Sequence, residues 1–235
     1  MQFNGFQKTS LIEWPGKIVS IVWVAGCNFR CPFCYNRDLV LKNTDLKIFE
    51  ESKILEYLEE NKNLIDGLMI TGGEPTLQPE LADFLAKVHQ LELKVGIESN
   101  ATHPEIIENL LKNKLVDYLA VDIKAPLEKD KYKKLTGVEI DVEKIKKSIK
   151  LIKDSDIEYE FRTTIIPNLL NKKDILEISQ TLKGAQRYVI QQFIPQETMI
   201  NHDLVEIKPY SKEELLAIER EIKDNFQECY VRGLD

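Results

Sequence analysis

Apolar residues along the chain fall into two kinds of segment that alternate. Short β-branched apolar runs predict strands, and longer segments with apolar residues three or four positions apart predict amphipathic helices. The expected strands cover residues 18–25, 68–71, 93–98, 118–123, 158–166 and 188–193, with a further strand over 229–232. The expected helices cover residues 49–64, 79–91, 104–113, 142–153, 172–182 and 212–225.

This alternation of strand and helix predicts a parallel sheet with right-handed crossovers. Two architectures fit it: an open doubly wound sheet, and a (β/α) barrel with fewer than eight units. No Gly-x-Gly-x-x-Gly sequence follows the first strand, which disfavours the dinucleotide-binding form of the doubly wound sheet. In both architectures a ligand binds at the carboxyl ends of the strands, so unusual residues there are candidates for a site.

Length, composition and charge narrow the class of protein. With 235 residues, of which 43% are hydrophobic, we expect one domain with a packed core. No apolar run approaches the roughly 20 residues that span a bilayer. Residues 1–6 lack the basic and apolar regions of a secretion signal, so we expect a cytoplasmic protein with no membrane partner. The formal charge of −7 argues against nucleic acid as a partner.

Three cysteines follow the first expected strand at the spacing Cys27-x3-Cys31-x2-Cys34. Three thiolates can hold three irons of a 4Fe-4S cluster and leave the fourth iron without a protein ligand. An open metal position is a place for chemistry, whereas a closed site mainly carries electrons or supports the fold. The spacing therefore favours an enzyme.

Two other uses of these cysteines compete with the cluster: a structural zinc site and a disulfide framework. A structural zinc site needs four ligands, usually supplied as two close pairs, and each candidate for the fourth stands alone and far away. These candidates are His89, His103, His202 and Cys229. A disulfide framework is disfavoured because four cysteines in 235 residues are sparse. The cluster is the better interpretation, and the zinc site stays open.

Polar residues also gather where the other expected strands end. Singly, each cluster has a plain interpretation: a strand-to-helix turn for the glycine pair, a helix cap for Asn100, and an ion pair for Asp122 with Lys124. Together they predict one site along the carboxyl edge of the sheet. The clusters are Thr71-Gly72-Gly73-Glu74-Pro75, Glu98-Ser99-Asn100, Asp122-Ile123-Lys124, Arg162-Thr163-Thr164 and Gln191-Gln192-Phe193.

The cysteine motif, with Phe33 just before its last cysteine, and the Gly72-Gly73-Glu74 sequence resemble those of the radical S-adenosylmethionine (radical SAM) superfamily. Three further segments are similar to patterns of one branch, the activating proteins of anaerobic ribonucleoside-triphosphate reductase, which are kin of pyruvate formate-lyase activating enzymes. These segments are Ser10-Leu11-Ile12-Glu13-Trp14-Pro15-Gly16-Lys17, Asp122-Ile123-Lys124-Ala125-Pro126 and Tyr132-x2-Leu135-Thr136-Gly137.

The resemblance implies an α/β fold: an incomplete (β/α)6 TIM-like barrel with a lead-in segment over 1–17, a core barrel over 18–200, and a C-terminal helix and strand over 201–235. It implies two cofactors, a 4Fe-4S cluster and S-adenosylmethionine. Cys27, Cys31 and Cys34 would hold the cluster. The implied contacts to S-adenosylmethionine are Gly72, Gly73 and Glu74 through backbone carbonyls, Asn100, Asp122, Lys124 and Arg162, with Phe33 and residues 192–195 toward the adenine.

The resemblance also implies the reaction. A radical SAM oxidoreductase would cleave S-adenosylmethionine reductively, and the resulting 5′-deoxyadenosyl radical would take a hydrogen atom from a backbone glycine of a partner enzyme. The implied partner is anaerobic ribonucleoside-triphosphate reductase, with a flavodoxin or ferredoxin as reductant. Activation of another glycyl-radical enzyme such as pyruvate formate-lyase, and chemistry on a small molecule or a peptide, remain alternatives. A non-catalytic iron–sulfur or zinc protein is the alternative from another class.

The chain departs from its relatives at two positions. Tyr35 follows the last cysteine of the motif, where many relatives of this branch carry histidine. No histidine occurs over 191–195, where pyruvate formate-lyase activators place one near the cofactor. Cys229 stands alone, which predicts a buried or half-buried thiol, and too few cysteines remain for a second cluster.

Overall fold

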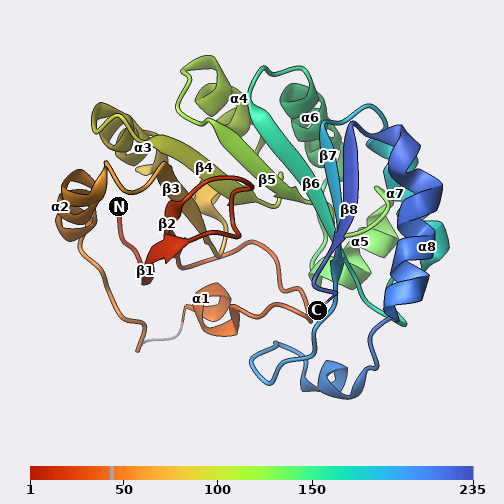
Figure 1. Ribbon diagram of the computed structural model, residues 1–235. Coiled ribbons are helices and arrows are strands. Elements are labelled where there is room, and N and C mark those ends of the chain that lie inside the picture. Colours follow the sequence, from red (N-terminus) through yellow and green to blue (C-terminus); the bar gives the residue numbers. More distant parts are fainter. Residues whose placement is uncertain (43–44, 235) are drawn as a thin grey trace.

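The computed structural model describes residues 1–42 and 45–234. Its strands form one eight-stranded sheet in which they follow one another in chain order (Figure 1). They are β1 (Gly5–Ser10), β2 (Val19–Val24), β3 (Gly67–Gly72), β4 (Lys94–Ser99), β5 (Tyr118–Asp122), β6 (Glu158–Ile165), β7 (Arg187–Gln192) and β8 (Glu228–Arg232). β1 runs antiparallel to β2, and every later pair of neighbours is parallel.

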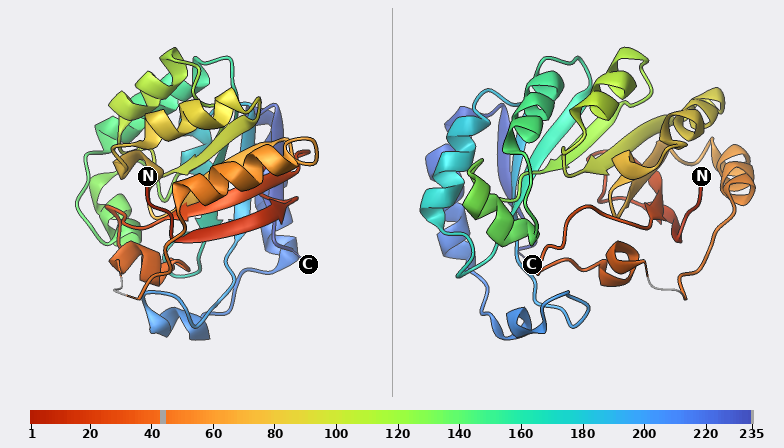
Figure 2. Two further views of the ribbon diagram at one scale, coloured as in Figure 1. Left: turned by 90° about the vertical axis from the view of Figure 1, so that its left-hand side faces the viewer. Right: turned by 180° about the vertical axis from the view of Figure 1, so that it is seen from behind.

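The helices are α1 (Arg37–Leu41), α2 (Glu51–Asn61), α3 (Leu81–Gln90), α4 (Pro104–Lys112), α5 (Lys129–Thr136), α6 (Val142–Lys153), α7 (Lys172–Thr181) and α8 (Lys212–Ile222). Three short 3-10 helices are η1 (Pro75–Leu77), η2 (His202–Glu206) and η3 (Lys223–Asn225). Figure 2 shows a curved sheet with the longer helices along its outer side. In the described part of the chain, no helix combines the length and the apolar character that crossing a bilayer requires.

The predicted incomplete barrel is confirmed. The six expected strand–helix units appear as β2 to β7 with the helices that follow them, and the further expected strand is β8. The sheet order begins at β1 and ends at β8, so within the described residues these are its two edges and the barrel is open between them. Because β2 to β8 are parallel, their carboxyl ends lie along one edge of the sheet.

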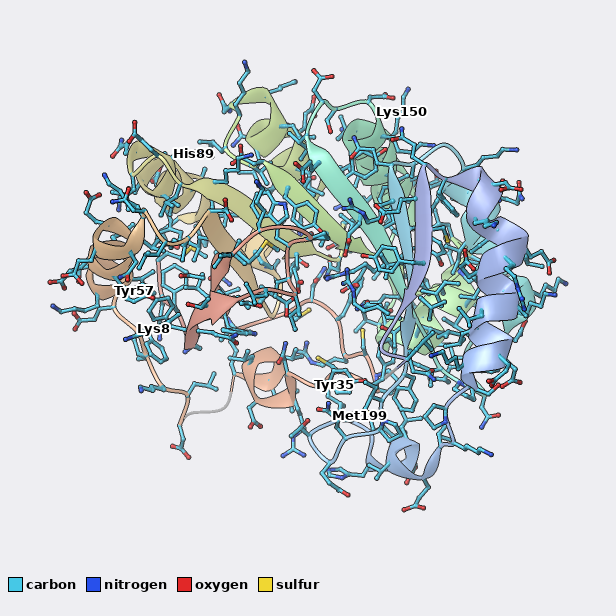
Figure 3. The ribbon with its side chains drawn as sticks, viewed as in Figure 1. Lys8, Tyr35, Tyr57, His89, Lys150 and Met199 are labelled. Atoms are coloured by element: carbon cyan, nitrogen blue, oxygen red, sulfur yellow. The ribbon has the colours of Figure 1, made fainter. Side chains whose placement is uncertain are left out.

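Three elements were not expected from the sequence: β1, α1 and α5. β1 carries three exposed polar residues in a row, so it lacks the alternation of a half-buried strand. Its Phe6 ring meets Tyr57 of α2 edge to face at 5.2 Å, and Lys8 lies over the same tyrosine ring (Figure 3). α5 has few apolar residues and ends at Gly137, whose φ of +70° favours glycine.

The inner side of the barrel has a small apolar cluster of its own. Trp14, from the loop between β1 and β2, is fully buried there and stacks on Tyr118 of β5 with ring centroids 4.9 Å apart. Gly96 on β4 makes room for this cluster, because a Cβ at that position would stand 2.1 Å from the Met69 sulfur. The lead-in segment therefore fills the inside of the barrel as well as extending its sheet.

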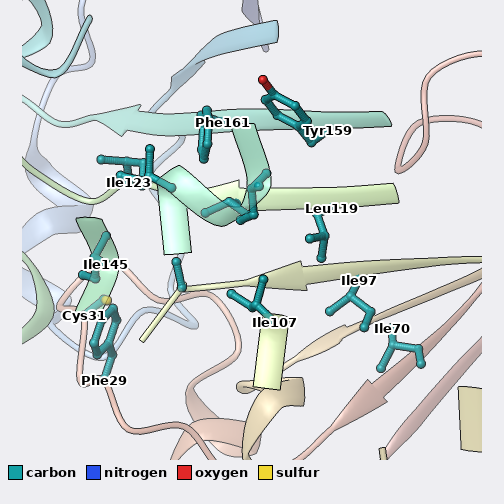
Figure 4. Packing of buried hydrophobic residues seen from close by; sticks show 14 of the residues in the cluster. Phe29, Cys31, Ile70, Ile97, Ile107, Leu119, Ile123, Ile145, Tyr159 and Phe161 are labelled. Atoms are coloured by element: carbon teal, nitrogen blue, oxygen red, sulfur yellow. The ribbon is translucent and has the colours of Figure 1, made fainter. Parts of the chain in front are cut away.

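The main core lies between the outer side of the sheet and the helices. Figure 4 shows Ile70, Ile97 and Leu119 from successive strands in this layer. The same cluster includes Phe29 and Cys31, which lie beside Ile145 of α6. The loop that carries the cysteines is therefore anchored on its outer side by the core.

Candidate active site

A cavity of about 260 Å³ lies at the carboxyl ends of the strands. Of the residues that the sequence marked as ligands or cofactor contacts, residues 192–195 do not line it, whereas the others do: Cys27, Cys31, Phe33, Cys34, Gly72, Gly73, Glu74, Asn100, Asp122, Lys124 and Arg162. These residues come from the loops after β2 and β3 and from the ends of β4, β5 and β6. The topology thus brings together residues that are up to 135 positions apart in sequence. The role of each residue in binding the cluster or S-adenosylmethionine stays a prediction.

The cysteine loop is held by hydrogen bonds within itself and by one neighbouring helix. The backbone N–H of Cys34 donates to the Cys31 carbonyl at 3.0 Å, and that of Phe29 donates to the Cys27 sulfur at 3.3 Å. Arg30 folds back on the loop, with Nη1 2.8 Å from the Cys27 carbonyl oxygen. The Arg30 backbone N–H donates to the Thr136 carbonyl at the end of α5, at 2.7 Å. These bonds fix the loop before any cofactor binds.

The three thiols are free and face one cavity, which is the donor set that a 4Fe-4S cluster requires. Among the described residues, no three His, Cys, Asp or Glu side chains converge on one point as a single metal ion would demand. A four-iron cluster differs because each cysteine binds a separate iron. Burial raises the pKa of Cys27 to about 11 and that of Cys31 to about 12, so cluster binding must release their protons.

The Gly72-Gly73 pair is explained by a close approach of two backbones. Gly73 N–H donates to the Val24 carbonyl and Glu74 N–H to the Gly26 carbonyl, both at 2.8 Å. A Cβ on Gly73 would stand 2.0 Å from the Gly26 carbonyl oxygen, and Gly72 has a φ of +115°. Only glycine fits both positions. The two glycines thus let the turn after β3 come close enough to hydrogen-bond with the start of the cysteine loop.

The Glu74 carboxylate is committed to the scaffold. One oxygen accepts from the Thr76 hydroxyl at 2.6 Å, from the Thr76 N–H at 3.1 Å and from the Ser99 hydroxyl at 2.8 Å. The other accepts from the Asn100 N–H at 2.8 Å. Glu74 is only 1% exposed, and burial raises its pKa. Its side chain thus ties the end of β3 to the end of β4, and a contact to cofactor falls to the backbone of the motif.

Asn100 links β4 to the cysteine loop. Its Nδ2 donates to Asn28 Oδ1 at 2.7 Å, and its Oδ1 accepts from the Thr102 hydroxyl at 2.6 Å. The helix cap that the sequence offered as its plain interpretation is wrong, since the N-cap of α4 is His103. Asn100 instead shapes the wall beside Cys27.

A row of charged residues crosses the cavity. Lys124 Nζ lies 3.0 Å from Asp122 Oδ2, which is the ion pair expected from their alternation, and Arg162 Nη1 lies 2.9 Å from Glu98 Oε1. Burial alone would raise the pKa of Asp122, but Lys124 and Arg162 overcome it and hold that pKa low. Arg162 Nε is buried and lies 3.4 Å from Asp122 Oδ1, so the guanidinium is paired with both Glu98 and Asp122.

Glu13 belongs to the cavity although the sequence gave it no role. It comes from the lead-in loop and lines the same space as Glu98 and Arg162. Burial, followed by the neighbouring Glu98 carboxylate, raises the pKa of Glu13 to about 7. The only sequence signal was its place in the lead-in motif, because no periodicity predicts that this loop turns inward.

A groove adjoins the cavity, and the two share Tyr35 and Asn36 in their walls. Its other walls come from Gly5 of β1, Trp23 of β2, α1 and residues 197–202. The Arg37 guanidinium lies 3.2 Å from His202 Nε2 across it. Figure 3 places Tyr35 and Met199 at the same end of the molecule. The groove therefore lies directly beside the cavity, with Tyr35 and Asn36 in the walls of both.

The residues suggested for the adenine occupy different surroundings. Phe33 lines the cavity, with Lys124 Nζ 5.6 Å from its ring centroid. Phe193 is fully buried in the core, whereas Ile194 is 49% exposed. Gln192 turns away and donates to the Tyr210 carbonyl at 2.6 Å. Cys229 is half-buried on β8, as expected, and lies outside the cavity.

Comparison with known proteins agrees with this geometry. Residues 21–182 match the Radical SAM superfamily. A glycyl-radical enzyme activating enzyme, so named, of Methanocaldococcus jannaschii is 36% identical over 200 residues, which cover 83% of this chain and 80% of that protein. The pyruvate formate-lyase-activating enzyme of Clostridium pasteurianum is 24% identical over 95% of this chain and 97% of its own.

Solved structures share the fold. SuiB of Streptococcus suis bound to S-adenosylmethionine superposes with a TM-score of 0.69 at 17% identity, and covers 91% of this chain. This chain spans about half of the SuiB chain, 50%. TYW1 with a lysine-pyruvate adduct superposes with a TM-score of 0.60 at 17% identity, over 88% of this chain and 74% of its own.

The cavity, its three free cysteines and the family match lead to one conclusion. This chain belongs to the radical SAM superfamily and is an oxidoreductase of the kind that uses a 4Fe-4S cluster together with S-adenosylmethionine.

Proposed function

We propose that the chain activates a glycyl-radical enzyme by removing a hydrogen atom from a backbone glycine of that partner. The partner we propose is anaerobic ribonucleoside-triphosphate reductase. The observation that carries the proposal is the groove beside the cavity, which shares Tyr35 and Asn36 with the walls of the site. The relatives named above support the same class of partner.

Each part of the cavity has a task in this function. Cys27, Cys31 and Cys34 hold the cluster, and the positive charges of Lys124 and Arg162, which line the same cavity, suit the carboxylate of S-adenosylmethionine. When bound, the two cofactors together supply the 5′-deoxyadenosyl radical that takes the hydrogen atom. The hydrogen bonds of Glu74 and Asn100 fix the loops that position these groups.

The groove suits a segment of polypeptide. Its floor includes the half-buried Trp23 indole and Gly5, whose absent side chain leaves the indole uncovered: a Cβ there would stand 3.0 Å from the ring. Polar and charged side chains of Asn4, Arg37 and Glu197 line its rim. An extended loop can rest on an aromatic surface while rim groups bind its backbone, which is how peptide sites commonly work.

The choice of partner rests on the lead-in segment and on the relatives. The sequence Ser10 to Lys17 is similar to the branch that activates the reductase, and no histidine occurs at residues 191–195. Pyruvate formate-lyase is the second partner to test, because the alignment with its activating enzyme from Clostridium pasteurianum covers 95% of this chain at 24% identity.

The experiment tests whether a hydrogen atom moves from a glycine of the partner to 5′-deoxyadenosine. Partner protein carrying deuterated glycine is incubated anaerobically with the reconstituted chain, S-adenosylmethionine and a reductant, and 5′-deoxyadenosine is analysed by mass spectrometry. We expect deuterium in 5′-deoxyadenosine with the reductase, and none when its radical-bearing glycine is replaced by alanine. Unlabelled 5′-deoxyadenosine with both the reductase and pyruvate formate-lyase would refute the proposal.

A further inference from the structure

Two cationic side chains flank the backbone of the first cysteine. Arg30 Nη1 donates to the Cys27 carbonyl at 2.8 Å and to the Phe29 carbonyl at 2.6 Å. From the other side, Lys42 extends over Gly26, so that its ammonium nitrogen lies 3.1 Å from the point where a Gly26 Cβ would stand. Both residues are exposed. One positive charge therefore lies against the backbone of Cys27 and a second against that of its neighbour Gly26, both at the surface.

This surface contrasts with the rest of the molecule. The chain carries a net charge of −7, yet the segment 27–42 holds three cations and a single carboxylate. That carboxylate, Asp38, lies 3.7 Å from Arg37 Nε. The positive charge of this segment thus gathers at the exposed edge of the cysteine loop, where Arg30 and Lys42 lie on its backbone.

We propose that Arg30 and Lys42 form the docking site of the external electron donor, a one-electron carrier protein with an acidic face. The cavity takes one side of the loop and the core covers Phe29 and Cys31 on another, so a protein donor can approach the cluster only at the exposed edge, where Arg30 and Lys42 lie. Opposite charge on the two faces speeds encounter and orients the donor over Cys27, which shortens the path for the electron.

The docking step itself changes no covalent bond. The donor loses one electron and the cluster held by Cys27, Cys31 and Cys34 gains it, with no proton transferred. The inference rests on the cluster of the superfamily and not on the identity of the glycyl-radical partner. It therefore stands or falls separately from the proposed function.

The test reverses one charge on the docking surface and one elsewhere. Lys42→Glu is compared with Lys150→Glu, since Lys150 is an exposed residue of α6 at the opposite end of the molecule from Tyr35 (Figure 3). The probe is an acidic flavodoxin in its fully reduced form. Binding is measured by isothermal titration calorimetry and cluster reduction by anaerobic stopped-flow absorbance, both at low ionic strength. Reduced methyl viologen, a small cationic donor that needs no docking, is the second electron source.

We expect Lys42→Glu to weaken flavodoxin binding and to slow its electron transfer by about tenfold, with an effect that fades as salt is added. Lys150→Glu should match the wild type, and methyl viologen should reduce all three proteins equally. Equal flavodoxin rates and affinities for Lys42→Glu and Lys150→Glu would overturn the proposal. So would an equal slowing of Lys42→Glu with methyl viologen, because the residue would then act on the cluster and not on docking.

Discussion

The Tyr35 hydroxyl is bonded twice to the backbone of Ile194: it donates to the carbonyl oxygen at 2.8 Å and accepts from the N–H at 3.2 Å. Tyr35 follows the last cysteine of the motif, and Ile194 begins the segment after β7. A third bond, from Asn201 N–H to the Pro32 carbonyl at 2.8 Å, joins the same two segments. The wall of the groove is thus attached directly to the cysteine loop.

Tyr35→Phe should loosen this wall without unfolding the protein. The substitution removes both hydrogen bonds while keeping the ring, and Tyr35 is 37% exposed, so the loss should be about 1 kcal/mol, or roughly 2–4 °C in Tm. Hydrogen exchange measured by mass spectrometry should speed up over residues 193–207. Tyr57→Phe is the control, because that residue contacts Phe6 and Lys8 through its ring. Unchanged exchange over 193–207 would show that the Tyr35 hydroxyl does not hold the segment.

Replacing any cysteine of the motif by serine should abolish the cluster. Wild-type protein reconstituted anaerobically should bind about four irons, and Cys27→Ser, Cys31→Ser and Cys34→Ser should each retain less than about half of them. Cleavage of S-adenosylmethionine should fall to the level without protein. Iron analysis and chromatography of 5′-deoxyadenosine measure the two effects. The matched control is Cys229→Ser, on β8 outside the cavity, and loss of iron in that variant would contradict the assignment.

Glu74→Gln should destabilise the fold. The amide cannot accept all four bonds that the carboxylate receives from Thr76, Ser99 and Asn100, and one buried donor is left unpaired. The expected cost is about 1–3 kcal/mol, and differential scanning calorimetry of the cluster-free protein should show a Tm lower by several degrees. Glu80→Gln, an exposed change nearby, should have little effect. If Glu74→Gln and Glu80→Gln have the same Tm, the Glu74 side chain serves the cofactor and not the scaffold.

Glu13 predicts a pH dependence of stability. Burial and the neighbouring Glu98 raise its pKa to about 7, so between about pH 4.5 and pH 7 the folded chain binds a proton that the unfolded chain has lost. This contribution to the free energy of unfolding is present at low pH and disappears as the pH rises through that window. Glu13→Gln removes it.

The measurement is Tm against pH from 5 to 8 for the wild type and Glu13→Gln. The wild type should lose roughly 2–4 °C relative to the variant as pH rises, the equivalent of about 1 kcal/mol in a chain of this size. Parallel curves would contradict the raised pKa of Glu13.

The sequence was a good guide to the parallel part of the fold and to the residues of the cavity. Buried parallel strands are apolar on both faces, so runs such as β2 and β5 are visible without any structure. Because their carboxyl ends meet at one edge, the polar residues that follow them could be placed together in advance. The family motif then supplied what spacing alone left open, namely a cluster and not a zinc ion.

Other parts depended on contacts that no local pattern shows. β1 is polar on its exposed positions and becomes a strand only because β2 offers an unpaired edge. Trp14 and Glu13 turn into the barrel because the inner side needs filling, which sequence periodicity does not report. The motif predicted a cofactor contact for the Glu74 backbone and nothing for its side chain, whose four scaffold bonds emerge only when β3 and β4 lie side by side.

The most direct test of the central claim is the electron paramagnetic resonance spectrum of the partner. Anaerobic ribonucleoside-triphosphate reductase is incubated with the reconstituted chain, S-adenosylmethionine and a reductant, and pyruvate formate-lyase is treated in parallel. We predict the doublet of a glycyl radical in the reductase, dependent on S-adenosylmethionine and lost with Cys31→Ser. Formation of 5′-deoxyadenosine without a glycyl radical signal in either partner would contradict the account.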